Sequence, residues 1–381
     1  MKKYNKTYLF SNIFPHYDEP LWTTLINNIK GLEIGFDSND NRGIKLVDID
    51  SYEPDLKNRF FQIKNFWIMN KHLVFQLGVI RRCILNNTVN NIFLGDSKII
   101  STWISIIISK IKGSNVILWT HGIYGNEGKL KLFVRKIFYR LADKLILYER
   151  RAKAKMIELG FDKNNLYVIF NSLNYEKQRI LYERFNLNQE NNNFSFFKNN
   201  SLPVLIFIGR LTEVKKIDLL IKAVKKINKK NDIVNLLIIG DGEQRNYLEK
   251  ISRKYLDNTI YFFGECNDEE ITGKFIFYSS LCVSPGNVGL TAIHSLSYGT
   301  PVLTHNNFNN QMPEVESIQP GFNGYFFEEN NLDDLIKKIL YHLKTQKISK
   351  NDCRRVVDMY YNPKYQLSVF EKIINNIKPE L

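Results

Sequence analysis

The chain has 381 residues, 44% of them hydrophobic and 13% aromatic, and a formal net charge of +14. This apolar content can fill two cores and excludes a globally disordered chain. Four scattered cysteines without CxxC spacing argue against a zinc site or a disulfide framework, and fit a reducing compartment. Residues 1–200 carry 30 Lys and Arg against 18 Asp and Glu, whereas residues 201–381 carry 23 against 21. The basic half indicates an anionic partner, nucleic acid or membrane, unless it reflects a Lys-rich genome.

In the first half, the N-terminus lacks the apolar core of a signal peptide. The run IISTWISIIISKI at residues 99–111 is too short to span a bilayer and predicts a buried helix. Residues 186–200 contain seven asparagines and predict an interdomain linker. Short apolar runs predict strands at residues 91–95, 116–119, 145–148 and 167–169.

The second half repeats this pattern, with helical periodicity at residues 217–227 and 332–343 between apolar runs. Continuous β-branched runs predict strands buried on both faces, and therefore parallel sheets. We predict two doubly wound α/β domains, residues 1–190 and 201–358, with a C-terminal helix at about 360–381 that packs back on the first. The strand runs are residues 204–208, 236–239, 260–263, 281–283 and 302–304.

The first candidate site is IFIGRLTEVKKIDLLIKAV, residues 206–224. A buried strand ends at Gly209, Arg210 follows, and Lys215 precedes a helix. Glycine allows close backbone approach, and arginine offers a planar fork for phosphate oxygens. The two cations predict a diphosphate clamp, and the alternative is a solvated basic helix start.

Two further strand ends carry glycines. The strand at 236–239 runs into the turn Gly240-Asp241-Gly242, a weak signal when taken alone. The strand at 281–283 leads through SPGNVG into a helix at about 290–298. The amides of Gly289, Leu290 and Thr291 would point outward at this helix start and form an anion nest.

Together, GRLTEVK, IIGDGE, SPGNVGLTAIHSLSYGTPV and MPEVESIQPGFNGYFF resemble glycosyltransferase family 4 in order and spacing. Weaker matches are WTHGIYG, LADKLILYERRAK and VIFNSLN, whereas the first 90 residues diverge. The resemblance implies the GT-B fold, in which two Rossmann-like domains face each other across a cleft.

The resemblance also implies roles for individual residues. Arg210 and Lys215 match the pair that binds the donor diphosphate, and His121 matches a histidine that reaches the donor sugar. The alternative for His121 is a structural role. Gly264 and Glu265 match the nucleobase region. The implied donor-binding set is Gly209, Gly240, Asp241, Gly242, Gly264, Glu265, Asn287, Val288, Gly289, Leu290, Thr291 and His294.

The chain departs from the family pattern at three positions. Two glutamates that usually contact the donor sugar and the ribose are replaced by Gly286 and His294. His294 can still hydrogen-bond a ribose, or it can simply fill a helix face. The glycine that follows the family lysine is Lys216.

From the resemblance we expect a retaining, metal-independent glycosyltransferase without a cofactor. It would move a sugar from a nucleotide-sugar to a saccharide or lipid-linked acceptor in capsule or O-antigen synthesis. Arg210, Lys215 and the amides after residue 288 would stabilise the charge of the departing diphosphate.

The segment KLKLFVRKIFYR, residues 129–140, predicts a basic amphipathic helix on an anionic membrane. We therefore expect a cytoplasmic protein, peripheral on the inner membrane face. The alternative is an ordinary helix packed on its sheet. The expected membrane-facing residues are Lys129, Lys131, Arg135, Lys136 and Arg140.

Other protein classes fit less well. A nucleic-acid partner is not expected, because the chain lacks a zinc-finger pattern and an RRM-like aromatic motif. A non-catalytic GT-B protein that binds a nucleotide-sugar is the main alternative, motivated by Gly286 and His294. Epimerisation or phosphorolysis is less favoured.

Overall fold

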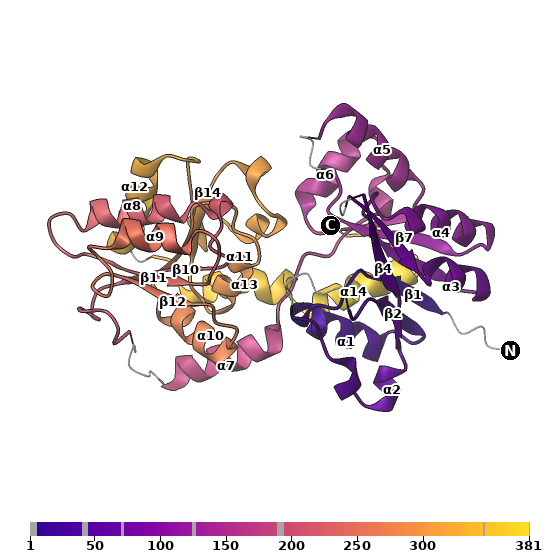
Figure 1. Cartoon of the computed structure of the whole chain (residues 1–381), viewed down its shortest axis with the longest axis horizontal. Helices are drawn as coiled ribbons and strands as arrows, with labels where there is room; N and C mark the ends of the chain where they lie inside the picture. The colour runs from indigo at the N-terminus through magenta and orange to yellow at the C-terminus, as the bar shows by residue number, and fades with distance from the viewer. Residues whose placement is uncertain are drawn as a thin grey trace. The chain divides into compact units, whose positions relative to one another are not determined.

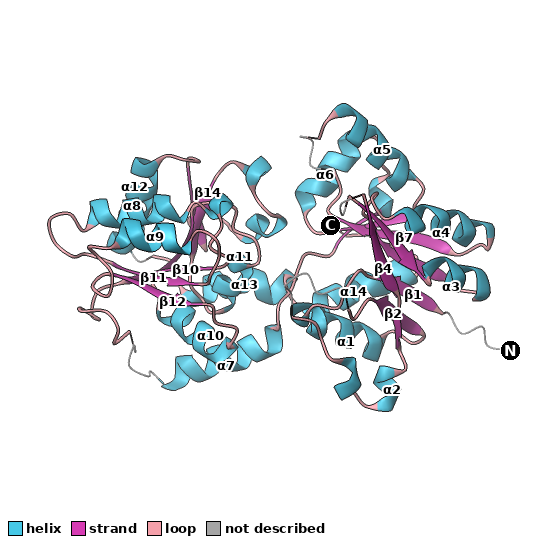
Figure 2. Cartoon of the chain, viewed as in Figure 1, coloured by secondary structure: helices cyan, strands magenta, loops and turns pink. Residues whose placement is uncertain are grey.

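The structure is a computed structural model that describes residues 6–39, 45–69, 72–123, 127–188, 194–345 and 347–380. It consists of two compact units (Figure 1). Unit 1 comprises Met1–Ser172 and Asn362–Leu381, and unit 2 comprises Leu173–Tyr361. Each unit has a parallel sheet with helices on both faces (Figure 2). The predicted doubly wound α/β class is therefore confirmed.

The sheet of unit 1 has seven parallel strands in the order β3-β2-β1-β6-β7-β8-β9. The order reverses between β1 and β6, so the loops after these two strands leave the sheet side by side at its carboxyl edge. The strands are β1 (Thr7–Phe10), β2 (Leu32–Phe36), β3 (Phe60–Gln62), β6 (Asn90–Leu94), β7 (Asn115–Thr120), β8 (Lys144–Leu147) and β9 (Leu166–Val168). The last four lie where the apolar runs predicted them.

Two helical layers bury the two faces of this sheet. One core contains α1 (Glu19–Asn28) and α14 (Pro363–Ile374), and Figure 1 shows the yellow α14 among the elements of unit 1. The chain end is held there by buried Phe370 and by the Lys144 ammonium, which donates to the Asn376 side chain at 2.7 Å. The other core contains α3 (Val79–Leu85), α4 (Ile100–Ile111), α5 (Lys129–Arg140) and α6 (Arg150–Glu158). The short α2 (Pro54–Lys57) precedes β3.

Helix α4 is not the fully buried helix that its apolar sequence predicts. Its buried face consists mainly of Ser101, Thr102, Ser105 and Ser109, with Ile106. The Ser109 hydroxyl accepts a hydrogen bond from the Asn91 side chain at 2.9 Å, which explains how a polar face can be buried. Three isoleucines face outward instead: Ile104, Ile107 and Ile111.

The sheet of unit 2 has six strands in the order β12-β11-β10-β13-β14-β15, all parallel. They are β10 (Val204–Ile208), β11 (Asn235–Ile239), β12 (Ile260–Gly264), β13 (Leu281–Ser284), β14 (Val302–His305) and β15 (Gly324–Phe327). The helices are α7 (Tyr175–Asn188), α8 (Ile217–Ile227), α9 (Arg245–Ser252), α10 (Glu269–Tyr278), α11 (Thr291–Ser297), α12 (Leu332–Thr345) and α13 (Lys350–Tyr360). The strand β10 and the helix α8 have the predicted bounds.

The unit boundary precedes the asparagine-rich segment that was predicted as a linker. The chain passes from unit 1 to unit 2 at Ser172, before α7, because α7 packs on α10 and α11. It returns to unit 1 at Asn362. Residues 189–193 lie outside the described residues. Phe194 and Phe197 are buried in unit 2, where Phe194 stacks on Phe275. The prediction of a linker gave weight to the asparagines and overlooked the phenylalanines in the same segment.

Candidate functional site

Unit 2 brings the predicted diphosphate clamp to the reversal point of its sheet. The strand order reverses between β10 and β13, and such switch points are where open α/β sheets bind ligands. Arg210 and Lys215 follow β10, and residues 287–291 follow β13. The Thr291 hydroxyl donates to the Ile208 carbonyl at 2.9 Å and so ties the start of α11 to the end of β10. The two predicted motifs therefore form one site.

The neighbouring strand ends are held together by backbone hydrogen bonds. The Gly209 amide donates to the Ile239 carbonyl at 3.0 Å, and the Gly240 amide donates to the Gly264 carbonyl at 2.8 Å. At Gly240 an added Cβ would lie 1.9 Å from the Gly209 carbonyl oxygen, so only glycine fits. Gly240, which was predicted as a donor contact, thus allows the backbones of these strand ends to approach closely.

Lys215 is the half-buried cation of this edge, whereas Arg210 is exposed. The Lys215 ammonium donates to the Asn287 carbonyl at 2.7 Å. Burial lowers the pKa of Lys215 to about 8; the Glu314 carboxylate opposes this shift and the Arg210 charge adds to it. A cation that has lost part of its hydration in this way is well prepared to meet an incoming anion.

The loop after β13 offers backbone amides, but not at every predicted position. The first helical bond of α11 runs from the Ala292 amide to the Gly289 carbonyl. The amides of Gly289, Leu290 and Thr291 therefore precede the bonded part of the helix, as an anion nest requires. The Val288 amide instead donates to the Gln311 side chain at 2.9 Å. Val288 supports the loop through this bond.

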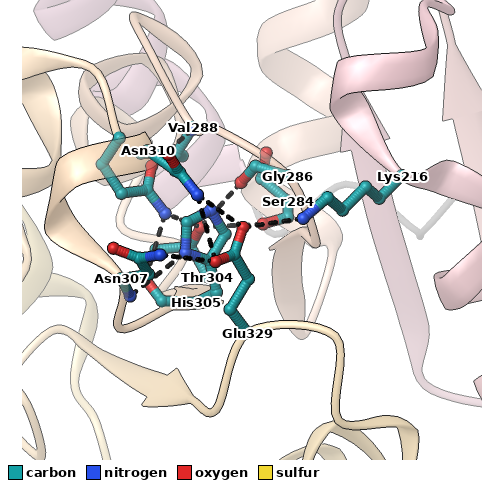
Figure 3. Close-up of polar contacts among 10 residues, drawn as sticks. Lys216, Ser284, Gly286, Val288, Thr304, His305, Asn307, Asn310 and Glu329 are labelled. Carbon is teal, nitrogen blue, oxygen red and sulfur yellow. Dashed lines mark hydrogen bonds and ion pairs between the residues drawn. The ribbon is translucent and has the colours of Figure 1, made fainter.

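A polar network connects this loop to the segment after β14 (Figure 3). Gln311 donates to the Thr304 hydroxyl at 2.8 Å, and Thr304 donates to the Ser284 and Gly286 carbonyls at 2.8 and 3.1 Å. Because Gln311 also holds Val288, the loop from 284 to 288 is braced along its length.

The same network explains Lys216, which replaces the family glycine. Lys216 has the left-handed φ of +51°, which costs a residue with a Cβ roughly 1–2 kcal/mol. Its ammonium pairs with the Glu329 carboxylate at 2.7 Å, and Asn307 and Asn310 donate to the same carboxylate (Figure 3). Hydrogen bonds from Lys216 and the two asparagines lower the pKa of Glu329 to about 2. This ionised anchor holds the residue next to Lys215 in place.

Gly286 has no room for the glutamate that the family carries. A Cβ there would lie 2.0 Å from the Val214 carbonyl oxygen and 2.7 Å from the Lys215 Cα. The Gly286 amide donates to the Lys215 carbonyl at 3.0 Å. The backbone of Val214 and Lys215 thus occupies the space that a side chain at position 286 would need.

His294 has a partner inside unit 2. Its Nε2 lies 3.0 Å from the Glu269 carboxylate, to which Tyr298 also donates at 2.8 Å. Burial would raise the pKa of Glu269, but the charge of His294 and hydrogen bonds from His294 and Tyr298 lower it to about 2. An ionised Glu269 requires a proton on Nε2, which leaves Nδ1 as the atom of His294 available to a ligand.

The remaining predicted donor residues lie at the same carboxyl edge. The Asp241 carboxylate accepts from the Gly242 amide at 2.7 Å and pairs with Arg245 at 3.2 Å. Glu265 is exposed and accepts from the Asn267 side chain at 3.1 Å. Glu265 stands in the region predicted for the nucleobase, and Asp241 stands in the predicted Gly240-Asp241-Gly242 turn.

The lowered pKa of Lys215 leads to a pH prediction. An anionic diphosphate prefers the protonated ammonium, so donor affinity should fall as pH rises past about 8, where free Lys215 loses its charge. Calorimetric titration of a nucleotide donor between about pH 7 and 9 measures this. A Lys215→Arg variant stays charged and should show a flat profile. Equal slopes for both proteins would contradict the assignment.

In unit 1, His121 lines a pocket of about 350 Å³ at the carboxyl ends of β6 and β7. The Tyr148 ring lies against the imidazole, with centroids 4.5 Å apart. Burial, assisted by the charge of Arg135, lowers the pKa of His121 to about 4. His121 is therefore a neutral imidazole at pH 7, suited to hydrogen bonding. Tyr124 and Gly125 of the WTHGIYG match lie outside the described residues.

Helix α5 has the predicted bounds, but its basic residues do not all face solvent. Arg135 points inward and pairs with Glu127 at 2.6 Å, with its side chain 12% exposed. It also donates to the Tyr139 hydroxyl at 2.9 Å, because residues 135, 138 and 139 share the inner face. The membrane-facing prediction is wrong for Arg135. Lys129, Lys131 and Arg140 are exposed and Lys136 is half-buried.

Sequence reasoning missed four residues that support the site: Glu269, Gln311, Glu314 and Glu329. Glu314 stands in the motif MPEVESIQPGFNGYFF, which was given no role for any single residue, and Gln311 immediately precedes this motif. Glu314 is 3% exposed and acts on Lys215. The signal that could have found Glu314 is its place inside one of the motifs that carry the family resemblance. Nothing in the sequence pairs Glu269 with His294, which stand 25 positions apart.

The described residues contain neither a metal-binding cluster nor a helix that could span a membrane. Within the described ranges, no group of three or more His, Cys, Asp or Glu side chains is arranged to hold a metal ion. In the same part of the chain, no helix combines the length and the apolarity needed to cross a membrane.

Solved structures share the fold over nearly the whole chain. An apo lipopolysaccharide outer core galactosyltransferase superposes with a TM-score of 0.66 at 14% identity, covering 97% of this chain and 99% of that one. An Anabaena protein, HepE, in complex with UDP gives a TM-score of 0.69 at 14% identity, covering 97% and 100%. This chain therefore has the GT-B fold.

The sequence matches are narrower. Residues 188–356 match the family model described as Glycosyl transferases group 1. An uncharacterised glycosyltransferase of Methanocaldococcus jannaschii is 22% identical over 263 residues, 66% of this chain and 64% of that protein. An uncharacterised 41.2 kDa protein in the cps region of Klebsiella pneumoniae is 25% identical over 231 residues, 59% of each chain. The chain spans 46 to 64% of the length of the first three curated relatives.

Proposed function

We propose that the chain transfers a sugar from a nucleotide-sugar donor to an acceptor hydroxyl. The observation that carries this is the convergence of Arg210, Lys215 and the loop 287–291 on the switch point of unit 2. Two cations and outward amides are suited to stabilise a leaving diphosphate, the charge that grows as the glycosidic bond breaks. The match to the group 1 glycosyltransferase model over the same residues supports the proposal.

We assign the finer features as follows. Arg210 and Lys215 bind the diphosphate without a metal ion, and transfer retains the anomeric configuration. His121 supplies a neutral hydrogen-bonding group toward a sugar hydroxyl. Gly264, Glu265 and Asp241 contact the nucleoside, and the Nδ1 of His294 contacts the ribose. These roles follow the family resemblance and the positions of the residues at one sheet edge.

The acceptor that we propose is a lipid-linked saccharide in bacterial surface polysaccharide synthesis. The relative in a cps region supports this polymer class. The exposed cations Lys129, Lys131 and Arg140 on α5 favour a peripheral position on the cytoplasmic face of the membrane.

A second candidate is a GT-B protein that binds a nucleotide-sugar without transferring it. Gly286 excludes a carboxylate from the place where the family contacts the sugar, and His294 is already engaged by Glu269. A protein of this kind would retain donor affinity and lack hydrolysis and transfer.

The deciding experiment is a panel of UDP-, GDP-, dTDP- and CMP-sugars, with binding and slow hydrolysis measured for each. UDP-sugars come first, because HepE was solved with UDP and with UDP-glucose. We expect saturable binding of one donor, with hydrolysis lost in Arg210→Ala. Binding without hydrolysis or transfer to any lipid acceptor would favour the second candidate. No binding at all would contradict both.

A further inference from the structure

One stretch of unit 1 combines most of the net charge with half of the exposed large apolar side chains. Residues 64–140 contain twelve Lys and Arg against two Asp and Glu, a net charge of 12 − 2 = +10. Of the 26 large hydrophobic residues exposed in the described part of the chain, 13 lie between Phe66 and Ile137. Where exposed apolar side chains of this kind gather on one face, they mark an interaction site.

Helix α4 buries a mainly polar face and leaves three isoleucines exposed. Its serines face the sheet, whereas Ile104, Ile107 and Ile111 are 41%, 55% and 81% exposed. These three positions, spaced i, i+3 and i+7, lie on one side of the helix. A helix that packs on a sheet in water normally shows the reverse pattern, with its apolar stripe toward the core.

The neighbouring helix α5 continues this surface. Its exposed Leu130, Phe133, Val134 and Ile137 have the spacing i, i+3, i+4 and i+7 of one helix face. Trp103 of α4 and Phe138 of α5 lie with ring centroids 4.7 Å apart, so the helices are neighbours. Both helices contribute to the same core on one face of the sheet, and Figure 1 shows them next to each other there.

The antiparallel hairpin of β4 (Lys64–Ile68) and β5 (Leu73–Leu77) lies beside α4 and likewise turns polar side chains inward and apolar side chains outward. Side chains alternate along a strand, and here Phe66 and Ile68 face outward, each 42% exposed. The inward Asn65 and Gln76 bond each other at 3.1 Å. The hairpin is also bonded to α4, because the backbone amide of Gln76 donates to the Ser101 hydroxyl at 2.9 Å.

These inward bonds fix the hairpin to the carboxyl edge of the sheet. The Asn65 amide donates to the Asp37 carboxylate at 2.7 Å, and its side chain donates to the Asn12 carbonyl at 2.9 Å. Asn12 and Asp37 follow β1 and β2. The apolar outer side is thus held in place by buried hydrogen bonds and is not the result of a loose hairpin.

We propose that the outer sides of α4, α5 and the β4–β5 hairpin form a docking surface for an anionic phospholipid bilayer. Apolar side chains enter the interfacial region, and the surrounding cations meet lipid phosphates. A second copy of this chain is disfavoured as the occupant, because a symmetric contact would set two surfaces of like charge against each other.

This surface extends the membrane contact proposed for α5. Only its biological role, which is to bring the protein to a lipid-linked acceptor, rests on the proposed function. The surface would keep the carboxyl edge of unit 1 close to a lipid-linked acceptor. Bilayer binding itself does not depend on any donor or on transfer, so the two proposals can fail separately.

The test is co-sedimentation of the full chain with vesicles of phosphatidylcholine alone or mixed with phosphatidylglycerol. We expect binding to the anionic vesicles, weakened by salt. Ile107→Ser/Ile111→Ser should lower affinity about tenfold or more, and Phe66→Ser should lower it independently. Exposed Leu340 in α12, 40% exposed, offers the matched control Leu340→Ser, which should bind like the unchanged chain.

Three outcomes would overturn the proposal. They are no difference between neutral and anionic vesicles, unchanged binding in both variants, or no vesicle binding together with a concentration-dependent dimer that Ile107→Ser/Ile111→Ser abolishes. Because the substituted side chains are exposed, thermal unfolding should be unchanged and confirms that the variants fold. Donor binding by unit 2, measured on the same samples, reports separately on the proposed function.

Discussion

Replacing Lys215 by alanine should reduce donor hydrolysis and transfer by about 10²–10³-fold, the usual effect of removing one donor that stabilises a developing oxyanion. Lys215 is the half-buried cation at the switch point, and it also donates to the Asn287 carbonyl. The variant therefore loses both the charge that is proposed to meet the diphosphate and one support of the loop that carries the outward amides. Single-turnover hydrolysis and donor titration would separate the loss in rate from the loss in affinity.

Lys222→Ala is the matched control for this prediction. Lys222 lies on α8 a few residues further along the chain, is more than half exposed, and pairs with Asp218 at 2.8 Å. Exposed pairs of this kind contribute roughly 0–1 kcal/mol, so activity and stability should stay close to those of the unchanged chain. Full activity in Lys215→Ala would mean that the diphosphate binds elsewhere.

Restoring the family glutamate, Gly286→Glu, should destabilise unit 2 by about 3 kcal/mol or more and should not raise activity. The added Cβ would overlap the Val214 carbonyl oxygen, and that atom belongs to backbone that cannot rotate away. Relief requires a shift of residues 214–215, which displaces Lys215 and weakens donor binding. Urea unfolding and donor titration measure the two effects.

The smaller change Gly286→Ala shows whether the cause is steric. The clash already exists at Cβ, so alanine should reproduce most of the loss without adding a carboxylate. Gly128→Ala is the control, because its Cβ would meet no atom within 4 Å and its φ of −60° suits any residue. That control should cost less than about 1 kcal/mol. A stable, more active Gly286→Glu variant would contradict the close approach at this position.

Local patterns predicted the elements that positioned the site. The apolar runs of β10 and β13 and the helical period of α8 were recognisable because each is a property of consecutive residues. The strand ends with Gly209, Arg210, Lys215 and Gly289 predicted two anion-binding motifs, and the family resemblance joined them in one proposed site. Parallel strands end at a common edge, so their loops must meet there.

Other features were misjudged because they depend on contacts between distant segments. Residues 186–200 were predicted as a linker from their asparagines, yet Phe194 packs on Phe275, 81 positions away in the sequence. Arg135 was assigned to the membrane, yet it pairs with Glu127 and lines the same pocket as His121. The composition of a short segment does not reveal contacts such as Phe194 with Phe275, because these contacts form only when the chain folds.

The sequence by itself determined the class of fold and the order of the motifs along the strands, because periodicity and glycine placement are local, and it predicted which residues bind the anion. Only the tertiary structure decided that Gly286 is required by the backbone of Lys215, that His294 is held by Glu269, and that α4 turns its isoleucines outward. Each of these depends on which side of an element meets another part of the chain. An apolar run shows that a helix forms, whereas the direction of its apolar side is settled by the partners of its polar side.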